Sequence, residues 1–560
     1  MSWHFDFRRV GGHRYLYLVE KKRTPKGPRN VRHIYVGTPD KLLENLSRPL
    51  PSLKSFRFGT AAALLRAARE TGLLPALERY LPGSAGAQAA RLVFLQILGR
   101  AERPLSREGM AHWYPDSALP FLGIVKGSPS AKSLRPALHE LFDTGAIDSE
   151  EHPILTRARV HKIEESVLRS LVGRGLHPRY LFFDGTNFFS YHKGDRWFAR
   201  GRNKQKRFDL NQVALGLATA ETVPVLSEVY EGNLPDVKAF ALAFDALLKR
   251  LEHLEVSTEE MTLVFDRGNN STGTFEEVLG LMHVIAAIDR QQARKLLALP
   301  RQGFREVCLD SDARPILGRT DEWTGFGRTW RALVVYREGT AREQRSRWER
   351  TKKEVLETVA GWRTSLAEGR SSGRMVKSWM RDLVELIPRD YQGLFDYRLE
   401  KSGGVDWPVC EVNLPAEERL RDAWGKTVLI SDLPREKLSD EELVKGWLAK
   451  WEVEDDFRWL KDRYVMSVKP IWVWHEAVVP GHIFVCVMGL MLLRYLQWRV
   501  RDLGFTMKEL VETLERIRLV VAIRDGSPQV VLEQLGRREA ELVDRLQLLE
   551  LVPTVKGPKA

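Results

Sequence analysis

The chain of 560 residues contains little cysteine. Cys308, Cys410 and Cys486 are its only three cysteines, and they lie far apart in the sequence. This spacing excludes a disulfide framework and offers no Cys-x-x-Cys pair for zinc, so we expect a reducing, cytoplasmic environment. The beginning, "MSWHFDFRRVGG", has no apolar signal core, and the longest apolar run, residues 483–493, is too short to span a bilayer comfortably. We therefore expect a buried helix there and no membrane partner.

Internal repeats and low-complexity tracts are also missing. With 43% hydrophobic and 29% charged residues, the composition is typical of a folded globular protein, and the length suggests about two to four structural units. Acidic residues are outnumbered: 87 Lys and Arg face 74 Asp and Glu, which gives a formal charge of +13. Such an excess favours a polyanionic partner such as nucleic acid. Charge alone leaves open that the protein binds no nucleic acid.

Hydrophobic periodicity divides the chain into segments of different type. Short β-rich runs around the turn "TPKGPRN" come first, and a helical segment follows. Three consecutive strands, a helix, a strand, a helix and a strand then indicate a mixed α/β layer, which a less regular stretch with a charged helix and a hairpin interrupts. We expect a β-rich unit at 1–58, a helical domain at 59–175, an α/β core at 176–300 and 440–500, an insertion at 301–439 and a C-terminal helical segment at 501–560.

Two aspartates stand at apolar, strand-forming stretches. Asp184 lies within "YLFFDGTNFF", and Asp266 ends the strand of "TLVFDRG". Carboxylates on neighbouring strands form an oxygen-rich site suited to Mg²⁺ or Mn²⁺. The ordinary alternative is that each aspartate caps a loop or the following helix. A catalytic interpretation therefore needs a third acid.

A helical stretch near the C-terminus supplies that acid. In "GWLAKWEVEDDFRWLKDRY", Trp447, Lys450, Glu454 and Lys461 are spaced by three, four and seven residues. At about 100° per residue these positions fall within an arc of roughly 60°, so one helix face presents an aromatic ring, an ammonium, a carboxylate and a second ammonium. A solvated charged face is the ordinary explanation, but it does not account for this spacing.

The spacing resembles the signature Tyr, two residues, Arg, three residues, Glu, six residues, Lys (YREK) of a branch of insertion-sequence DDE transposases. Glu454 and Lys461 match it, whereas Trp447 replaces the usual Tyr and Lys450 the usual Arg. "DGTN" and "DRG" resemble the first-Asp and second-Asp motifs of these enzymes. The resemblance extends over about residues 180–496, with further similar pieces in "YEGNLPD" and "GHIFVCVMGLMLL".

This resemblance implies a mixed α/β fold: an RNase H-like catalytic core with a β-rich insertion, preceded by a small β unit and a helical domain. Asp184, Asp266 and Glu454 would be the catalytic residues and would hold two Mg²⁺ (or Mn²⁺) ions. The implied activity is that of a DNA transposase that cuts transposon ends and joins the 3′-OH to target DNA. Its partners would be inverted-repeat and target DNA, bound by a homodimer. Two alternatives stay open: an RNase H-like nuclease or resolvase without strand transfer, and a catalytically decayed derivative that only binds DNA.

Further side chains are candidates for DNA contacts. The segment "RGRNKQKR" holds five basic residues in eight and stands beside the expected metal site, although a solvated loop explains it equally well. We assign DNA binding to Trp447, Lys450, Lys461, Arg200, Arg202, Lys204, Lys206 and Arg207, and recognition of the transposon ends to the helical domain.

Two other motifs are given structural roles. "EGNLPD" is interpreted as a turn that caps the next helix. His475 and His482 flank a bend near Pro480, and without a third nearby ligand we interpret both as structural.

Overall fold

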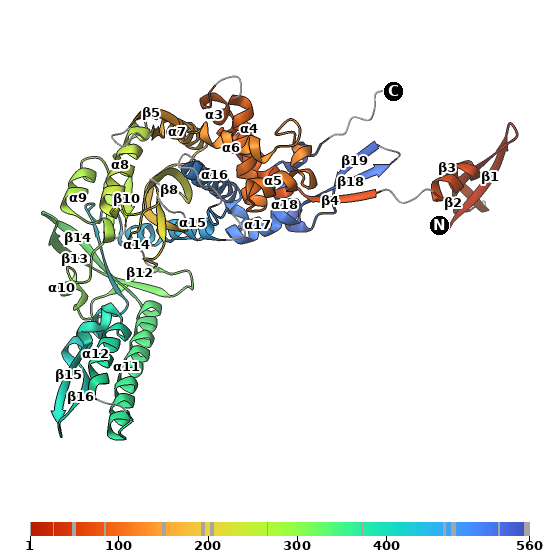
Figure 1. The fold of residues 1–560 in the computed structure, drawn as a ribbon. Helices are drawn as coiled ribbons and strands as arrows, with labels where there is room; N and C mark the ends of the chain where they lie inside the picture. The colour runs from red at the N-terminus through yellow and green to blue at the C-terminus, as the bar shows by residue number, and fades with distance from the viewer. Residues whose placement is uncertain are drawn as a thin grey trace.

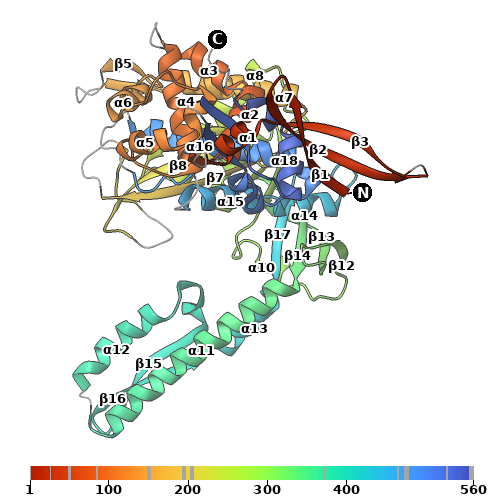
Figure 2. The ribbon, with the colours of Figure 1, turned by 90° about the vertical axis from the view of Figure 1, so that its right-hand side faces the viewer.

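A computed structural model describes residues 2–25, 27–47, 52–82, 86–147, 153–191, 197–201, 207–265, 267–370, 373–462, 466–471, 478–524 and 527–553. A body of helices surrounds one large sheet, and two regions project from it, as Figure 1 shows; Figure 2 shows one of them, an arm, from another side. One is a small sheet near the N-terminus, and the other is an arm of long helices and a hairpin.

The large sheet has nine strands in the order β12-β13-β14-β17-β11-β10-β7-β8-β9. β7 (Tyr180–Ser190), β8 (Asn211–Ala220) and β9 (Val223–Glu231) are antiparallel, while β10 (Thr262–Phe265) and β11 (His283–Ala287) run parallel to β7. Helix α8 (Asp236–His253) leads from β9 to β10, and α9 (Thr272–Val278) leads from β10 to β11. This arrangement is that of an RNase H-like core, so the expected mixed α/β fold class is confirmed.

Both faces of β7 are covered because its side chains alternate. On one face, the Phe183 ring meets Phe240 of α8 edge to face at 5.3 Å. On the other, α14 (Asp440–Leu448) lies against Tyr180: a Cβ placed on Gly446 would stand 3.0 Å from the Tyr180 ring, so glycine allows this close approach without displacing the ring. Helix α15 (Trp451–Lys461) also packs on β7.

Helix α16 (Val478–Arg499) forms the centre of the body. Among the described residues it is the one helix long and apolar enough to cross a membrane, and its apolar window is entirely buried inside the protein. It packs against β9, α15 and three helices of the preceding region. The expected buried helix is therefore confirmed.

The region before β7 is helical and shares one hydrophobic core with the sheet and α16. Its elements are α2 (Gly59–Glu70), α3 (Leu73–Tyr80), α4 (Gly86–Glu102), α5 (Arg107–Trp113), α6 (Ala131–His139), the strands β5 (Asp143–Ile147) and β6 (Pro153–Thr156), and α7 (Ala158–Gly173).

The expected insertion, 301–439, encloses four strands that belong to the large sheet. These are β12 (Arg305–Leu309), β13 (Pro315–Gly325), β14 (Arg328–Arg337) and β17 (Lys426–Ser431). They stay in the sheet because β17 pairs with both β11 and β14 and thereby buries their apolar side chains. The arm that leaves the sheet is therefore shorter than expected and spans 338–425. It consists of α11 (Glu338–Ala367), α12 (Gly373–Leu386), β15 (Phe395–Ser402), β16 (Val405–Val412) and α13 (Leu414–Ala423).

The two ends of the chain also contain strands. β1 (Ser2–Val10), β2 (His13–Thr24) and β3 (Gly27–Gly37) form an antiparallel sheet, followed by α1 (Pro39–Ser47). β4 (Ser52–Arg57) pairs instead with β18 (Arg518–Arg524), which pairs with β19 (Ser527–Leu532). The expected C-terminal helical segment at 501–560 is therefore helical only in part, because "RLVVAIR" completes a sheet with β4 between α17 (Met507–Arg516) and α18 (Arg537–Arg545).

Candidate active site

Asp184 stands on β7 beside the parallel strand β10. The described pairs of the ladder between β7 and β10 run up to Phe183 and Phe265, one residue before Asp184. The Asp184 carboxylate is partly buried, and its Oδ1 accepts a hydrogen bond from the Gly185 N–H at 2.8 Å. Asp266 follows Phe265 in the chain and lies outside the described residues.

Two contacts bracket the position of α15 along β7. Gly446 of α14 lies against Tyr180, and Lys461 at the end of α15 donates a 2.5 Å hydrogen bond from Nζ to Thr186 Oγ1. The chain from α14 to α15 therefore runs alongside β7 in the same direction as the strand. Asp184 and Glu454 each lie within the bracketed stretch, and Asp184 shares its strand face with Tyr180 and Thr186 by alternation.

Three successive acids of α15 have different environments. Arg494 of α16 is 2% exposed and binds Asp455 Oδ2 at 2.7 Å and Asp456 Oδ1 at 2.6 Å. Although burial opposes the charged form, the two carboxylates raise the pKa of Arg494 above its ordinary value. The Glu454 side chain is 64% exposed. Asp455 and Asp456 thus fix α15 to α16, and Glu454 is the acid turned outward.

The helix expected over 447–461 is interrupted. α14 ends at Leu448 and α15 begins at Trp451, while the Lys450 N–H bonds the Trp447 carbonyl at 3.2 Å and the Val453 N–H bonds the Lys450 carbonyl at 3.2 Å. These three-residue bonds tighten the chain into a turn. A single helix face bearing all four signature residues is therefore wrong, because Trp447 belongs to one helix, Glu454 and Lys461 to the next, and Lys450 to the junction.

Lys450 nevertheless joins the two helices. Its side chain is 9% exposed, its Nζ lies 3.8 Å from Glu454 Oε1, and it stands 5.3 Å from the Trp447 ring centroid. The ammonium therefore balances the Glu454 carboxylate. Sequence spacing could find this pair, since residues four apart meet on a helix.

The basic segment 200–207 begins and ends near the far end of β7. Arg200 and Arg207 are exposed, whereas Arg202, Lys204 and Lys206 lie outside the described residues. Ala199, beside Arg200, forms a bridge with Gln212, which pairs with Phe189 of β7. Arg207 binds Asp209 at 2.7 Å, and this hydrogen bond lowers the pKa of the Asp209 carboxyl.

Lys469 joins this basic region and is not among the residues predicted from sequence. Its Nζ lies 4.6 Å from the Phe189 ring centroid, and its pKa is lowered, chiefly by burial and then by the charge of Arg207. Lys461, Lys469 and Arg207 thus approach β7 beyond Asp184 from distant parts of the chain. No local pattern marks Lys469, because its neighbours at β7 are remote in sequence.

The loop "EGNLPD" packs tightly against β8. A Cβ on Gly232 would lie 1.9 Å from the Gln212 carbonyl oxygen, so this position excludes a side chain. Helix α8 begins at Asp236 with Pro235 as its N-cap and no side-chain capping bond. The expected capping role is therefore wrong, and close backbone packing explains the glycine.

His482 is structural, as expected. Its Nε2 donates to the Val468 carbonyl at 2.9 Å, and its Nδ1 lies 3.2 Å from Arg100 Nη2. Burial, and then the charge of Arg100, lowers the pKa of His482 to about 3. The neutral imidazole thus ties α16 to α4. His475 lies outside the described residues.

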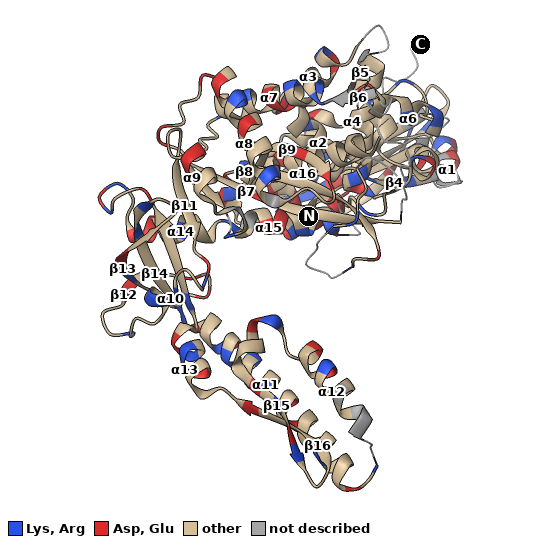
Figure 3. Ribbon diagram, turned by 60° about the vertical axis from the view of Figure 1, so that its left-hand side comes forward, with Lys and Arg blue, Asp and Glu red and all other residues tan. Residues whose placement is uncertain are grey.

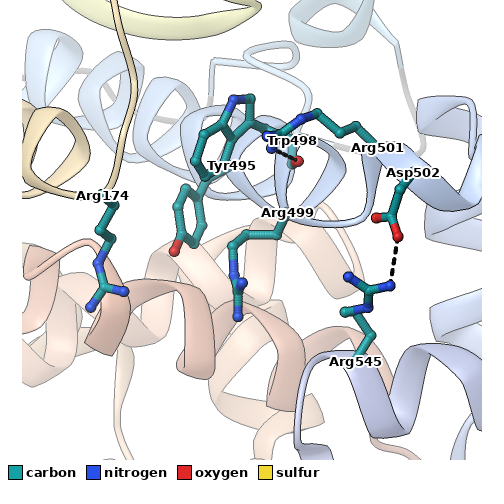
Figure 4. A pocket seen from close by; sticks show the side chains of 7 residues that line it. All are labelled: Arg174, Tyr495, Trp498, Arg499, Arg501, Asp502 and Arg545. Carbon is teal, nitrogen blue, oxygen red and sulfur yellow. Dashed lines mark hydrogen bonds and ion pairs between the residues drawn. The ribbon is translucent and has the colours of Figure 1, made fainter.

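The other end of α16 is fixed to α2 beside a basic basin. Tyr495 donates from its hydroxyl to Glu70 Oε2 at 2.7 Å, and Arg499 binds the same oxygen at 3.1 Å. Figure 4 shows the basin, a cavity of about 520 Å³. It is lined by Arg174, Tyr495, Trp498, Arg499, Arg501, Asp502 and Arg545. Because Arg494 precedes Tyr495, the same helix end holds α15 on one side and α2 on another.

Two of the three predicted metal ligands lie in the described part of the chain, and both are carboxylates. Asp184 and Glu454 offer carboxylate oxygens, which Mg²⁺ and Mn²⁺ prefer. In the described part of the chain, no group of three or more His, Cys, Asp or Glu side chains could hold a metal ion. The expected third ligand, Asp266, is outside that part.

Comparison with known proteins identifies the family. A family model described as a transposase DDE domain matches residues 176–467. A solved piggyBac transposase, in a synaptic complex with hairpin DNA, aligns with 89% of this chain and 87% of its own at 8% identity, but its TM-score of 0.37 supports no further argument. The search of curated proteins finds no match. Because the family model covers more than half of the 560 residues, the chain belongs to the transposase DDE domain family.

Proposed function

We propose that this transposase cuts the phosphodiesters at transposon ends and joins the released 3′-OH to target DNA. The observation that carries the proposal is the position of α15 along β7, between the Gly446–Tyr180 and Lys461–Thr186 contacts. Asp184 and the outward-turned Glu454 both lie in this stretch, and basic side chains gather at its end. Phosphodiester chemistry requires such a combination of carboxylates and phosphate-binding cations.

Asp184, Asp266 and Glu454 are the proposed catalytic residues and metal ligands. Phe183 and Phe265 are paired on neighbouring parallel strands. Asp184 follows the first of them in the chain, and Asp266 follows the second. Two Mg²⁺ or Mn²⁺ ions, when bound, would activate the attacking oxygen and stabilise the charge on the leaving oxygen. The side chains proposed to contact DNA are Trp447, Lys450, Lys461, Arg200, Arg202, Lys204, Lys206 and Arg207.

Placement in the YREK branch is also part of the proposal. Glu454 and Lys461 fit the signature, and the contact of the buried Lys450 ammonium with the exposed Glu454 carboxylate supports a role for an ammonium at the position where the branch has Arg. We further propose that the segment 59–175 recognises inverted-repeat DNA, that a homodimer assembles on the DNA, and that the protein acts in a bacterial-type cytoplasm.

The test is cleavage of labelled duplexes that carry the DNA flanking the coding sequence, with Mg²⁺ or Mn²⁺. Asp184→Asn, Asp266→Asn and Glu454→Gln should each abolish cleavage and leave DNA binding intact, since the amides keep volume but lose charge. Glu441→Gln is the matched control, because Glu441 is exposed on α14 and pairs with Lys445. Near wild-type cleavage by any one of the three variants would remove that residue from the metal site.

The same experiment separates the alternative functions. A wild-type protein that cuts ends but never joins them to a target plasmid would be a nuclease or resolvase. One that binds the ends and cuts with neither ion would be a decayed derivative.

A further inference from the structure

The positive charge of the chain is concentrated near its N-terminus. Residues 1–58 contain 13 Lys or Arg and 4 Asp or Glu, a net charge of +9. Residues 59–560 contain the remaining 74 and 70, a net charge of only +4. About a tenth of the chain thus carries most of the excess that attracts a polyanion.

Strand register places aromatic side chains together on one face of the N-terminal sheet. Phe5 pairs with Leu18 and Phe7 with Leu16, and partners directly opposite in an antiparallel sheet share a face. Trp3, two residues before Phe5, lies on this face by alternation. These three rings are 45%, 61% and 61% exposed, so a sheet of this size leaves a large apolar surface uncovered.

Basic residues lie at both ends of the same face. Arg9 pairs with Arg14 at one end, and Lys22 pairs with Arg29 at the other, where Arg32 stands opposite Glu20. All five basic residues are exposed.

Two of these cross-strand pairs join like charges, which destabilises a sheet. Glu20 is the one acidic residue of this face among the described residues, and it lies 3.8 Å from Lys22. The sheet therefore contains a repulsion that a polyanion would relieve.

The opposite face carries Arg8 and, by alternation, Lys21 and Arg23, and it differs because Arg8 is already engaged within the sheet. Arg8 binds Asp6 at 3.1 Å and lies 4.8 Å from the Tyr17 ring centroid. Tyr17 in turn contacts Tyr35 at 5.5 Å. These contacts within the sheet make that face the weaker candidate for a ligand.

We infer that the N-terminal face, formed by Trp3, Phe5, Phe7, Arg9, Arg14, Lys22, Arg29 and Arg32, binds DNA through phosphates and through unpaired bases. The basic groups neutralise the backbone, and the exposed rings stack on bases, which a closed duplex keeps inside. The inference rests on the proposed function, which makes DNA the substrate. It adds a binding surface outside the body, where Figure 1 shows this sheet.

The test measures how the affinity of the full chain for labelled single-stranded and duplex DNA depends on salt. A variant with Ala at Arg9, Arg14, Lys22, Arg29 and Arg32 should bind more weakly. Its slope of log affinity against log salt should be smaller by up to about 3.5 for single strands, since each contact contributes roughly 0.7. The matched control replaces five exposed basic residues of the arm, Arg350, Lys353, Arg370, Lys401 and Arg419, and should keep the wild-type slope.

A second variant separates bases from backbone. Replacing Trp3, Phe5 and Phe7 by Ala should weaken single-strand binding by roughly tenfold or more and duplex binding much less. Equal losses on both probes would overturn the role of unpaired bases. An unchanged salt slope in the five-residue variant would overturn the DNA interface, and a change of oligomeric state alone would assign this face to a second copy of the chain.

Cleavage by the same proteins keeps the two proposals apart. If the five-residue variant binds like wild type while Asp184→Asn abolishes cleavage, the inference fails and the proposed function stands. If the variant loses affinity while wild type cuts no DNA with either metal, the binding face stands and the proposed catalysis fails.

Discussion

The N-terminal sheet and the arm both project from the body (Figure 1), but they differ in charge and in core. The arm, residues 338–425, holds 16 Lys or Arg and 16 Asp or Glu, a net charge of zero. Figure 3 shows both signs interspersed along α11. The segment 1–58 carries +9 with far fewer residues. The net charge of +13 for the whole chain therefore does not show which region attracts DNA, because the charge is distributed unevenly.

The arm has a hydrophobic core of its own, centred on the fully buried Trp348. Tyr391 and Phe395 contact its ring at 5.2 and 5.3 Å, and Glu417 accepts hydrogen bonds from Trp348 Nε1 at 2.7 Å and Lys352 Nζ at 3.1 Å. Lys352 and Glu417 of the arm thus bind each other, whereas the N-terminal face places like charges opposite each other on neighbouring strands. The first pattern stabilises a rigid projection, and the second suits an external anion.

Replacing the central tryptophan of the arm should have the largest effect on this comparison. Trp348→Ala removes a fully buried ring and one of the donors to Glu417, so the arm should lose about 3–5 kcal/mol of stability. Amide hydrogen exchange along α11 should accelerate accordingly. Phe5→Ala is the matched control, since an exposed ring contributes little to folding, and exchange in β1 and β2 should stay near wild type. Similar losses in both regions would contradict the distinction.

Acid should distinguish the same two regions. Burial raises the pKa of Glu417, but Trp348, Lys352 and Arg421 outweigh it, so the folded-state pKa is below the ordinary 4.5. A depressed carboxyl pKa contributes stability that is present above about pH 4.5 and is lost as the pH falls through the folded value. The arm should therefore open before the N-terminal sheet during acid titration, as followed by hydrogen exchange.

Glu417→Gln should make arm opening nearly independent of pH in this range, at a cost of about 2 kcal/mol at neutral pH, because hydrogen bonds to a charged acceptor are lost. Glu400→Gln is the control on the same arm, since the Glu400 side chain is 52% exposed. A titration that Glu417→Gln leaves unchanged would assign the acid sensitivity to other carboxylates.

The parts of the fold that could be predicted from sequence depend on local pattern. The strands β7 to β11 follow from apolar runs bounded by turns, and their order was enough to place Asp184 on the first strand of the core. The strands β12 to β14 and β17 could not be placed in the core from sequence. The pairing of β17 with β14 joins segments that the whole arm separates in the chain, so no local pattern reveals it. β18 was missed for the same reason, since its partner β4 lies at the opposite end of the chain.

The site shows the same limit. The spacing of Glu454 and Lys461 on α15 is a local property and was available from sequence. The break between the two helices at Ala449 and Lys450 could not be predicted from sequence, because neither residue is Pro or Gly. Both residues even keep helical backbone angles. Packing decides it: α14 lies mainly on β12, β11 and β17 and reaches β7 at Tyr180, whereas α15 lies on β7 and α16. Arg494 likewise acts across 39 residues when it engages Asp455, which leaves Glu454 outward.

The smallest expected effect is that of Arg9→Glu. It distinguishes the two regions clearly, because this substitution should raise the stability of the N-terminal sheet while it lowers the affinity for DNA. Arg9→Glu converts the like-charge pair with Arg14 into an opposite-charge pair, so hydrogen exchange in β1 and β2 should slow by about twofold. DNA affinity should fall, since one phosphate contact is replaced by a repulsion. Arg8→Glu, on the adjacent residue, is the matched control: it places a second acid beside Asp6, so exchange should accelerate. Because Arg8 points to the other face, DNA affinity should change less than in Arg9→Glu. If Arg9→Glu instead accelerates exchange, or binds DNA like wild type, Arg9 and Arg14 are not held against each other for a polyanion, and the contrast between the two projections reduces to their cores.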